Sequence, residues 1–215
     1  MIKDKTINLF PVSVMICEQQ YKLDNKEIEY IKNIKQEKNH GGGENSKSVS
    51  SHILENKNLS NLKKYLNHKV QDYVYKNFQI EENIEFYITQ SWSNYNNKKE
   101  RHHKHHHPNS IISGVYYVQG NAPIIVHRKN SIFALDFPVK NFNIENSETW
   151  LFNTNPNDLM LFPSTLEHSV KQNENDETRI SIAFNTFIKG KIGDEQNLTG
   201  INVKEEIKEL NFYHI

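Results

Sequence analysis

The spacing of apolar residues changes near residue 83, and this change limits the folds that the chain can adopt. Before it, apolar side chains recur every three or four positions, which predicts one helix capped by Asn25 and a second from Ser60. After it, apolar and polar residues alternate, as in Ile84, Phe86 and Ile88. Helices followed by many short strands predict a mainly β fold with flanking helices.

Turn-rich segments divide the second part of the chain into short strand-like runs. These runs are 111–119, 123–127, 131–136, 158–162, 168–171 and 179–187. The length of 215 residues suits one domain over 1–215. We expect a strand over 9–16 and helices within 1–80 to pack on a core over 83–190. Residues 191–215 then form an extension that includes a helix-like stretch, 203–210.

Composition excludes some classes of function. The 26 basic and 26 acidic side chains balance, so the chain carries no specific signal for nucleic acid. No apolar run approaches the ~20 residues that cross a bilayer, and the first residues lack the apolar region of a secretory signal. The single Cys17 cannot form an internal disulfide. We therefore expect a soluble, cytoplasmic protein.

Five of the six residues from 102 to 107 are histidine. Side chains two positions apart on a strand point the same way, so His105 and His107 can bind one ion, with His168 as a third ligand from a distant strand. Three alternatives stay open. His103 can replace His107 as the partner of His105, only two histidines can bind, or the tract can be a solvated loop that binds metals adventitiously.

Arg179 and Ser181 share one face of a predicted strand whose other face carries Ile180, Ile182 and Phe184. If the apolar face packs in the core, a guanidinium and a hydroxyl point into a barrel interior and need a partner. A dicarboxylate supplies one, because arginine binds a carboxylate through two parallel hydrogen bonds. A surface ion pair of Arg179 with the nearby acidic residues 176 and 177 is the alternative.

In this order, the motifs resemble a small family of 2-oxoglutarate- and Fe(II)-dependent oxygenases from bacteria and their phages. The resemblance rests on Leu9-Phe10-Pro11, Ser91-Trp92, His105-His106-His107-Pro108-Asn109-Ser110, Ser113-Gly114-Val115-Tyr116-Tyr117-Val118, Leu161-Phe162-Pro163, His168 and Arg179-Ile180-Ser181. It spans nearly the whole chain and is weakest over 20–80 and after 190.

The resemblance implies a double-stranded β-helix (a jelly-roll, cupin-like core) that binds Fe(II) through His105, His107 and His168. It implies 2-oxoglutarate as co-substrate, bound by Arg179 and Ser181. The reaction would use O2 to hydroxylate an unidentified substrate, with release of succinate and CO2. Two further residues receive supporting roles: the Tyr117 hydroxyl binds the co-substrate, and Asn109 orients a ligand histidine.

The chain departs from the wider superfamily, which usually has His-x-Asp or His-x-Glu where this sequence has His105-x-His107. Asp136 and Glu167 are carboxylate alternatives if one histidine is misassigned. A cupin-like metal enzyme without 2-oxoglutarate and a non-catalytic jelly roll are the rival functions. We also expect a homodimer and a substrate pocket with walls formed by 94–104 and 140–150. The protein would act in the cytoplasm of a bacterial or phage-infected cell.

Overall fold

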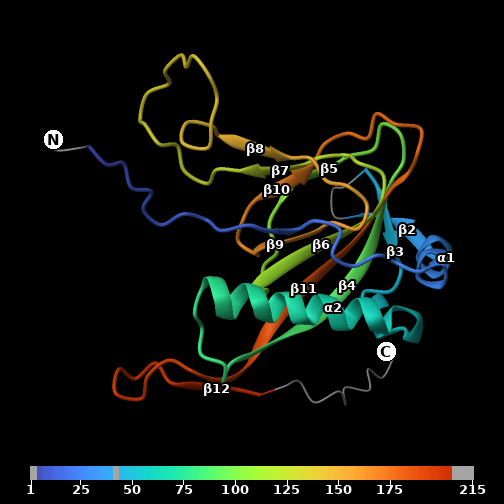
Figure 1. Cartoon of the computed structure of the whole chain (residues 1–215), viewed down its shortest axis with the longest axis horizontal. Helices are drawn as coiled ribbons and strands as arrows, with labels where there is room; N and C mark the ends of the chain where they lie inside the picture. Colours follow the sequence, from blue (N-terminus) through green and yellow to red (C-terminus); the bar gives the residue numbers. More distant parts are fainter. Residues whose placement is uncertain (1–3, 41–43, 205–215) are drawn as a thin grey trace.

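Two antiparallel sheets face each other in the computed structural model, which describes residues 4–40 and 44–204 (Figure 1). The larger sheet has eight strands in the order β1-β9-β6-β11-β4-β3-β2, with β12 paired to β11. The smaller sheet has the order β5-β10-β7-β8. Two facing antiparallel sheets with helices outside them confirm the predicted jelly-roll class.

The strands of the large sheet are β1 (Met15–Cys17), β2 (Gln36–Lys38), β3 (Ser46–Ser48), β4 (Glu85–Asn96), β6 (Ile112–Gln119), β9 (Leu159–Pro163), β11 (Arg179–Ile192) and β12 (Ile201–Val203). Those of the small sheet are β5 (His102–His105), β7 (Ile124–His127), β8 (Thr149–Phe152) and β10 (His168–Val170). The long strand β11 pairs with both β4 and β6 and so lies at the centre of the large sheet.

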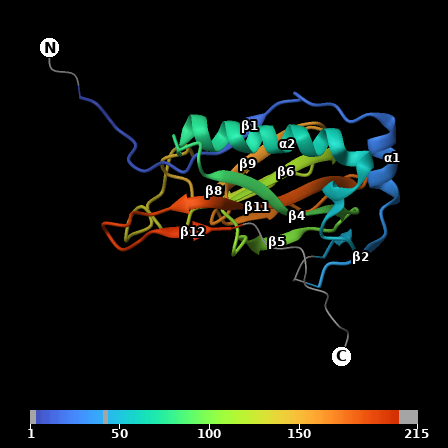
Figure 2. The same ribbon diagram turned by 90° about the horizontal axis from the view of Figure 1, so that it is seen from below.

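The helices lie outside the sheets. Helix α2 (Ser60–Asp72), extended by a π-turn η3 (Tyr73–Asn77), crosses the outer face of the large sheet (Figures 1 and 2). Helix α1 (Asn25–Asn33) follows a cap at Asp24, whose side chain accepts a hydrogen bond from the Glu27 amide at 2.8 Å. The Glu27 carboxylate accepts one from the Asp24 amide at 2.9 Å, so Asp24 caps the helix in place of Asn25.

Alternation along the large sheet creates two apolar cores. One face carries Tyr116, Ile182 and Phe184, which pack against α2. The opposite face carries Val115 and Tyr117, which pack with residues of the small sheet in the space between the sheets. Polar side chains on the inner face of β11 therefore lie inside the barrel, as the alternation of Arg179 and Ser181 with the apolar residues predicts.

Several predicted elements differ in the structure. Residues 131–136 form no strand but belong to the long connection between β7 and β8, and β8 itself was not predicted. Phe133 and Leu135 are exposed there, so their alternation serves no packed face. In place of the predicted 9–16 strand only β1 forms, and β2 and β3, which were not predicted, precede and follow residues 41–43 in the chain. Residues 41–43 and most of the predicted helix-like stretch 203–210 lie outside the described residues.

Within the described ranges, no helix is both long and apolar enough to span a bilayer. The division of the chain into one domain with an N-terminal part, a core and an extension stays a prediction.

Two short 3-10 helices, η1 (Ile53–Glu55) and η2 (Lys57–Leu59), lead into α2. The buried side chains of Leu59, Leu62 and Leu66 fix this helix on the sheet.

We predict that Gly114→Ala destabilises the fold. A methyl group at this position would lie 2.2 Å from the Phe184 ring and 2.7 Å from Leu161. Both are fully buried, so the core has no room to yield and the unfolding free energy should fall by about 1–3 kcal/mol or more. Urea unfolding measures the change. Gly200→Ala, which meets only the flexible Glu195 side chain, should change it by less than about 0.5 kcal/mol; equal effects would contradict the packing argument.

Candidate active site

A β-bulge in β5 brings two of the clustered histidines to one side of the strand. His168 of β10 stands opposite His105, whereas Val170, two residues on, stands opposite His102, three residues back. The extra residue on β5 turns both His102 and His105 toward the barrel interior. Their rings stack with centroids 4.5 Å apart and an interplanar angle of 16°.

His105, His107 and His168 come together as predicted. One ligand nitrogen of each lies within 4.8 Å of the others. The ring centroids of His105 and His168 are 4.4 Å apart, and that of His107 lies 5.1 Å from His168. His107 and His168 are buried and His105 is half-buried, so the cluster faces the space between the sheets.

Each of the three rings has its Nδ1 atom engaged. His105 Nδ1 lies 2.9 Å from the carbonyl of His103, and His168 Nδ1 lies 3.0 Å from the carbonyl of Leu166. His107 Nδ1 lies 2.5 Å from the side-chain oxygen of Asn185. Because these partners are acceptors, Nδ1 carries the proton and donates it, which leaves the lone pair of Nε2 free in all three rings.

Burial keeps these rings neutral. It lowers the pKa of His168 to about 3 and that of His105 to about 4, and it lowers the pKa of His107 as well. Nearby histidines lower the first two further, because a second positive charge would lie close by. A neutral imidazole is the form that ligates a metal, so the cluster is ready to bind an ion at neutral pH.

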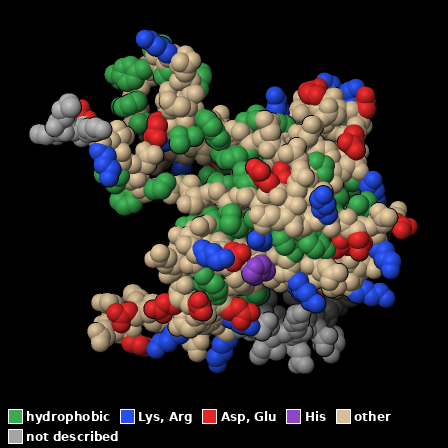
Figure 3. Space-filling view, viewed as in Figure 1, with side chains coloured by type: hydrophobic (Ala, Val, Ile, Leu, Met, Phe, Trp, Pro, Cys, Tyr) green, Lys and Arg blue, Asp and Glu red, His purple; other side chains and the backbone are tan. Residues whose placement is uncertain are grey.

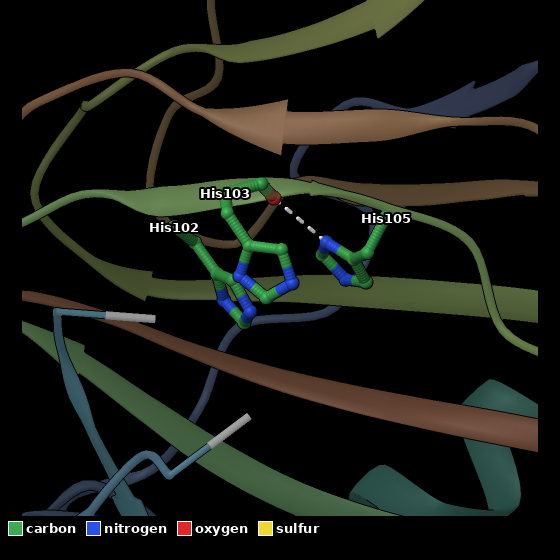
Figure 4. Close-up of side chains that lie close together, drawn as sticks. All are labelled: His102, His103 and His105. Carbon is green, nitrogen blue, oxygen red and sulfur yellow. Dashed lines mark hydrogen bonds between the residues drawn. The ribbon is translucent and has the colours of Figure 1, made fainter. Parts of the chain in front are cut away.

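A second cluster shares one residue with the first. His102, His103 and His105 also have ligand atoms within 4.8 Å of one another, and they extend from one strand, β5 (Figure 4). His103 is exposed, however. Side-chain hydrogen bonds orient the rings of His107 and His168, whereas none within the described part of the chain orients the rings of His102 or His103. This preorganisation favours the first cluster as the metal site.

Arg179 is fully buried in the same pocket as the histidines, so the predicted alternative of a surface ion pair is wrong. Its Nε atom donates to the carbonyl of Ala122 at 3.1 Å, and Nη1 donates to Ser181 Oγ at 3.1 Å. Asp176 instead pairs with Lys98 at 2.7 Å. Among the described residues no carboxylate forms an ion pair with Arg179, which leaves a buried cation that needs an anion.

Tyr117 and Tyr116 point to opposite sides of β6. The Tyr117 ring lies under the guanidinium of Arg179, at 5.2 Å, and burial raises the pKa of its hydroxyl to about 12. The Tyr116 hydroxyl donates to the carbonyl of Tyr21 on the helix side of the sheet. Tyr117 is therefore the inward member of the pair, next to the residues predicted to bind the co-substrate.

The orienting role predicted for Asn109 is filled by another residue. Asn109 is exposed in the turn after His107, with a positive φ of 58°. The side chain that meets His107 is Asn185, and Ser113 Oγ donates to the same Asn185 oxygen at 2.9 Å. Asn185 continues the inward alternation of Arg179 and Ser181 along β11. This alternation is the signal by which the sequence could have identified Asn185.

The same pocket includes three further side chains that the sequence interpretation did not assign: Trp92, Asn94 and Asn96, which alternate along β4.

Of the carboxylate alternatives, Glu167 turns away and pairs with Lys104 at 2.9 Å. Asp136 lies in the connection between β7 and β8, which lines a separate cavity of about 1050 Å3 together with Thr149–Leu151. Apolar side chains gather on this projecting segment (Figure 3).

We predict that Asn185→Leu weakens metal binding by about 10–100-fold, because His107 loses the acceptor that holds its tautomer and ring orientation. Asn185→Asp keeps an acceptor at the same place and should bind metal as the parent does. Titration of the metal-free proteins with Co(II) against a chromophoric chelator measures both. Equal affinities of the Leu and Asp variants would contradict an orienting role for Asn185.

Comparisons with known proteins agree with this geometry. The family described as "Putative 2OG-Fe(II) oxygenase" matches residues 90–185, which include all the inward residues described above. A comparison with curated proteins found no match in sequence.

Three solved structures share the fold. An oxidoreductase of the 2OG-Fe(II) oxygenase family from Burkholderia pseudomallei has a TM-score of 0.57 at 11% identity, over 80% of this chain and 83% of that one. HygX from Streptomyces hygroscopicus, with nickel, 2-oxoglutarate and hygromycin B bound, has a TM-score of 0.55 at 11% identity over 81% and 82%. A Pseudomonas putida prolyl-4-hydroxylase has a TM-score of 0.53 at 8% identity over 81% and 92%.

At such identities the likeness to solved structures establishes the fold, the double-stranded β-helix. The family match covers β6, the histidine cluster and β11 up to residue 185, and it agrees with the resemblance seen in the motifs. Over residues 90–185 the chain is therefore similar to the 2OG-Fe(II) oxygenase family.

Proposed function

We propose that the protein is an Fe(II)- and 2-oxoglutarate-dependent dioxygenase in which His105, His107 and His168 hold the iron. The observation that carries this assignment is the common state of the three rings. Each has its Nδ1 proton bound to an acceptor and its Nε2 lone pair free, and the three ligand atoms lie within 4.8 Å of one another. Imidazole suits Fe(II), and three ligands from one side leave coordination positions for other groups.

The buried Arg179 supports 2-oxoglutarate as the co-substrate. Its guanidinium and the hydroxyl of Ser181 lie in the same pocket as the three histidines. Among the described residues the guanidinium has no anionic partner. A dicarboxylate that reaches from the metal to Arg179 supplies the missing charge, so the residues present fit the co-substrate. The cupin-like alternative without 2-oxoglutarate would leave this cation uncompensated.

When bound together, iron and 2-oxoglutarate supply the oxidation: O2 is consumed, 2-oxoglutarate is decarboxylated to succinate and CO2, and the substrate is oxidised, in our proposal by hydroxylation. The protein's residues position the bound groups and exclude water from the site. Trp92 and Phe162 pack against His107 and His168, with ring centroids 5.7 and 4.8 Å apart, and limit access of water to those rings. Arg179, Ser181 and Tyr117 orient the co-substrate.

The proposed site is neutral where the superfamily usually has a carboxylate. Glu167 pairs with Lys104, and the groups of described His, Cys, Asp and Glu residues that can hold an ion consist of histidines alone. Three neutral ligands would leave the charge of the divalent ion uncompensated by the protein, so the co-substrate carboxylate that is not bound to Arg179 would balance part of it. We therefore expect iron and 2-oxoglutarate to bind with positive cooperativity.

We further propose a homodimer and a cytoplasmic location in a bacterial or phage-infected cell. Exposed apolar side chains on the β7–β8 connection, such as Phe133, Leu135 and Phe142, are 61%, 69% and 78% exposed and would be buried in a dimer. Cys17 is free, which suits a reducing compartment. Light scattering during size-exclusion chromatography tests the dimer, and a monomer at micromolar concentration would refute it.

We predict that anaerobic Fe(II) protein develops a visible metal-to-ligand charge-transfer band as 2-oxoglutarate is added. His168→Ala should lose iron and the band. Arg179→Met should keep iron but raise the Kd for 2-oxoglutarate by roughly 10–100-fold, because charge-assisted hydrogen bonds to the carboxylate are lost. Stoichiometric iron with no band in the parent protein would refute the co-substrate, and no iron binding would refute the metal site.

A matched set of variants distinguishes the two histidine clusters. His107→Ala should lose most Fe(II) affinity, whereas His103→Ala should keep it within about twofold. Calorimetric titration of the metal-free proteins gives both values without turnover. The reverse ranking would move the metal to His102, His103 and His105, the register that the sequence leaves open.

A further inference from the structure

The amide of Asn96 has one buried atom without a partner. Asn96 is 1% exposed, and its Nδ2 atom has no hydrogen-bond acceptor within the described part of the chain. Its Oδ1 atom lies 3.4 Å from Arg179 Nη1 and accepts a weak hydrogen bond from it. A buried N–H without an acceptor is rare in native proteins and calls for an explanation, such as a ligand.

Chemistry fixes the orientation of this amide. A guanidinium has donors only, so a flipped Asn96 would set its NH2 group against the N–H of Arg179. Oδ1 must therefore face Arg179, and Nδ2 must face the other way. Asn96 lines the pocket that also contains His168 and Ser181, and this pocket is where an acceptor for Nδ2 can bind.

The backbone holds Asn96 in place. Asn96 of β4 is the register partner of Arg179 of β11, so the two side chains leave the sheet on the same face. Asn173, itself buried, donates from its side chain to the carbonyl of Asn96 at 2.9 Å and to that of Glu177 at 2.8 Å. These bonds fix the end of β4 beside the start of β11, where Arg179 lies.

We propose that Asn96 is a co-substrate-binding residue: its Nδ2 atom donates a hydrogen bond to the far carboxylate of the dicarboxylate that Arg179 and Ser181 bind. This inference rests on the proposed function. A carboxylate has two oxygens with about four acceptor positions, and Asn96, Ser181 and the free guanidinium N–H groups offer donors around one pocket. An amide donor that is satisfied only by the ligand also selects for it, because a 2-oxo acid without the far carboxylate leaves Nδ2 unpaired.

The test is Asn96→Asp, which keeps the size and the acceptor toward Arg179 but replaces the donor with a negative oxygen. We expect the Kd for 2-oxoglutarate, measured calorimetrically on Ni(II)-loaded protein, to rise at least tenfold at pH 7.5, and the Kd for Ni(II) to stay within twofold. Asn96→Ala should raise the Kd for 2-oxoglutarate severalfold. For 2-oxobutyrate, which lacks the far carboxylate, the parent and the Ala variant should bind within twofold of each other.

Asn97→Asp is the matched control, since it places the same charge on the next, exposed residue of the chain. It should bind 2-oxoglutarate within twofold of the parent. An unchanged affinity for 2-oxoglutarate in both Asn96 variants would overturn the role of Asn96 and leave the proposed function intact. If the Ni(II)-loaded parent protein binds no 2-oxoglutarate, the proposed function fails as well. Loss of Ni(II) binding in both variants would show a structural role and also overturn the inference.

Discussion

The central position of β11 is the constraint on which the rest of the structure depends. This strand pairs with β4 on one side and β6 on the other, so its alternation is imposed on both neighbours. Ile180, Ile182 and Phe184 face α2 and close the outer core. The residues that alternate with them, Arg179, Ser181, Ala183 and Asn185, must then face the small sheet, and all except Ala183 are polar residues of the site.

The polar residues on β11 hold two different parts of the site at a fixed spacing. Arg179 and Ser181 lie at the beginning of the strand, where the guanidinium is buried over Tyr117. Asn185 lies further along the same face and holds His107 through Nδ1. Because one rigid strand carries both, the proposed metal ligand and the proposed carboxylate-binding group keep a constant separation, as a co-substrate that spans the two would require.

The small sheet contributes the remaining proposed ligands, His105 and His168, and an irregularity in β5 orients one of them. A regular β5 would have turned His102 and His105 to opposite faces, whereas the bulge opposite β10 directs both inward. His168, the first residue of β10, is the register partner of His105. The interior is thus lined with neutral rings and a buried cation that no described carboxylate balances. Such an interior favours an anionic ligand, and the unpaired atom of Asn96 in this pocket is likewise a donor, Nδ2.

The choice of His107 rather than His103 as the partner of His105 came from the family resemblance. The sequence by itself determined the change from helices to strands, the two faces of β11, and His105, His168 and Arg179 as candidate site residues. These follow from local periodicity and from the chemistry of each side chain, both of which can be read along the chain. Periodicity misplaced a strand at 131–136, where Phe133 and Leu135 alternate on an exposed connection.

Tertiary structure decided the partners. Asn185 rather than Asn109 meets His107, Asn96 stands beside Arg179, and β8 pairs with β7, because each depends on the register between segments far apart in the chain. Asn96 and Arg179 are 83 positions apart, and Asn185 and His107 are 78 apart. A hydrogen-bond partner is chosen by the distance between atoms in the folded chain, which residue spacing alone does not encode.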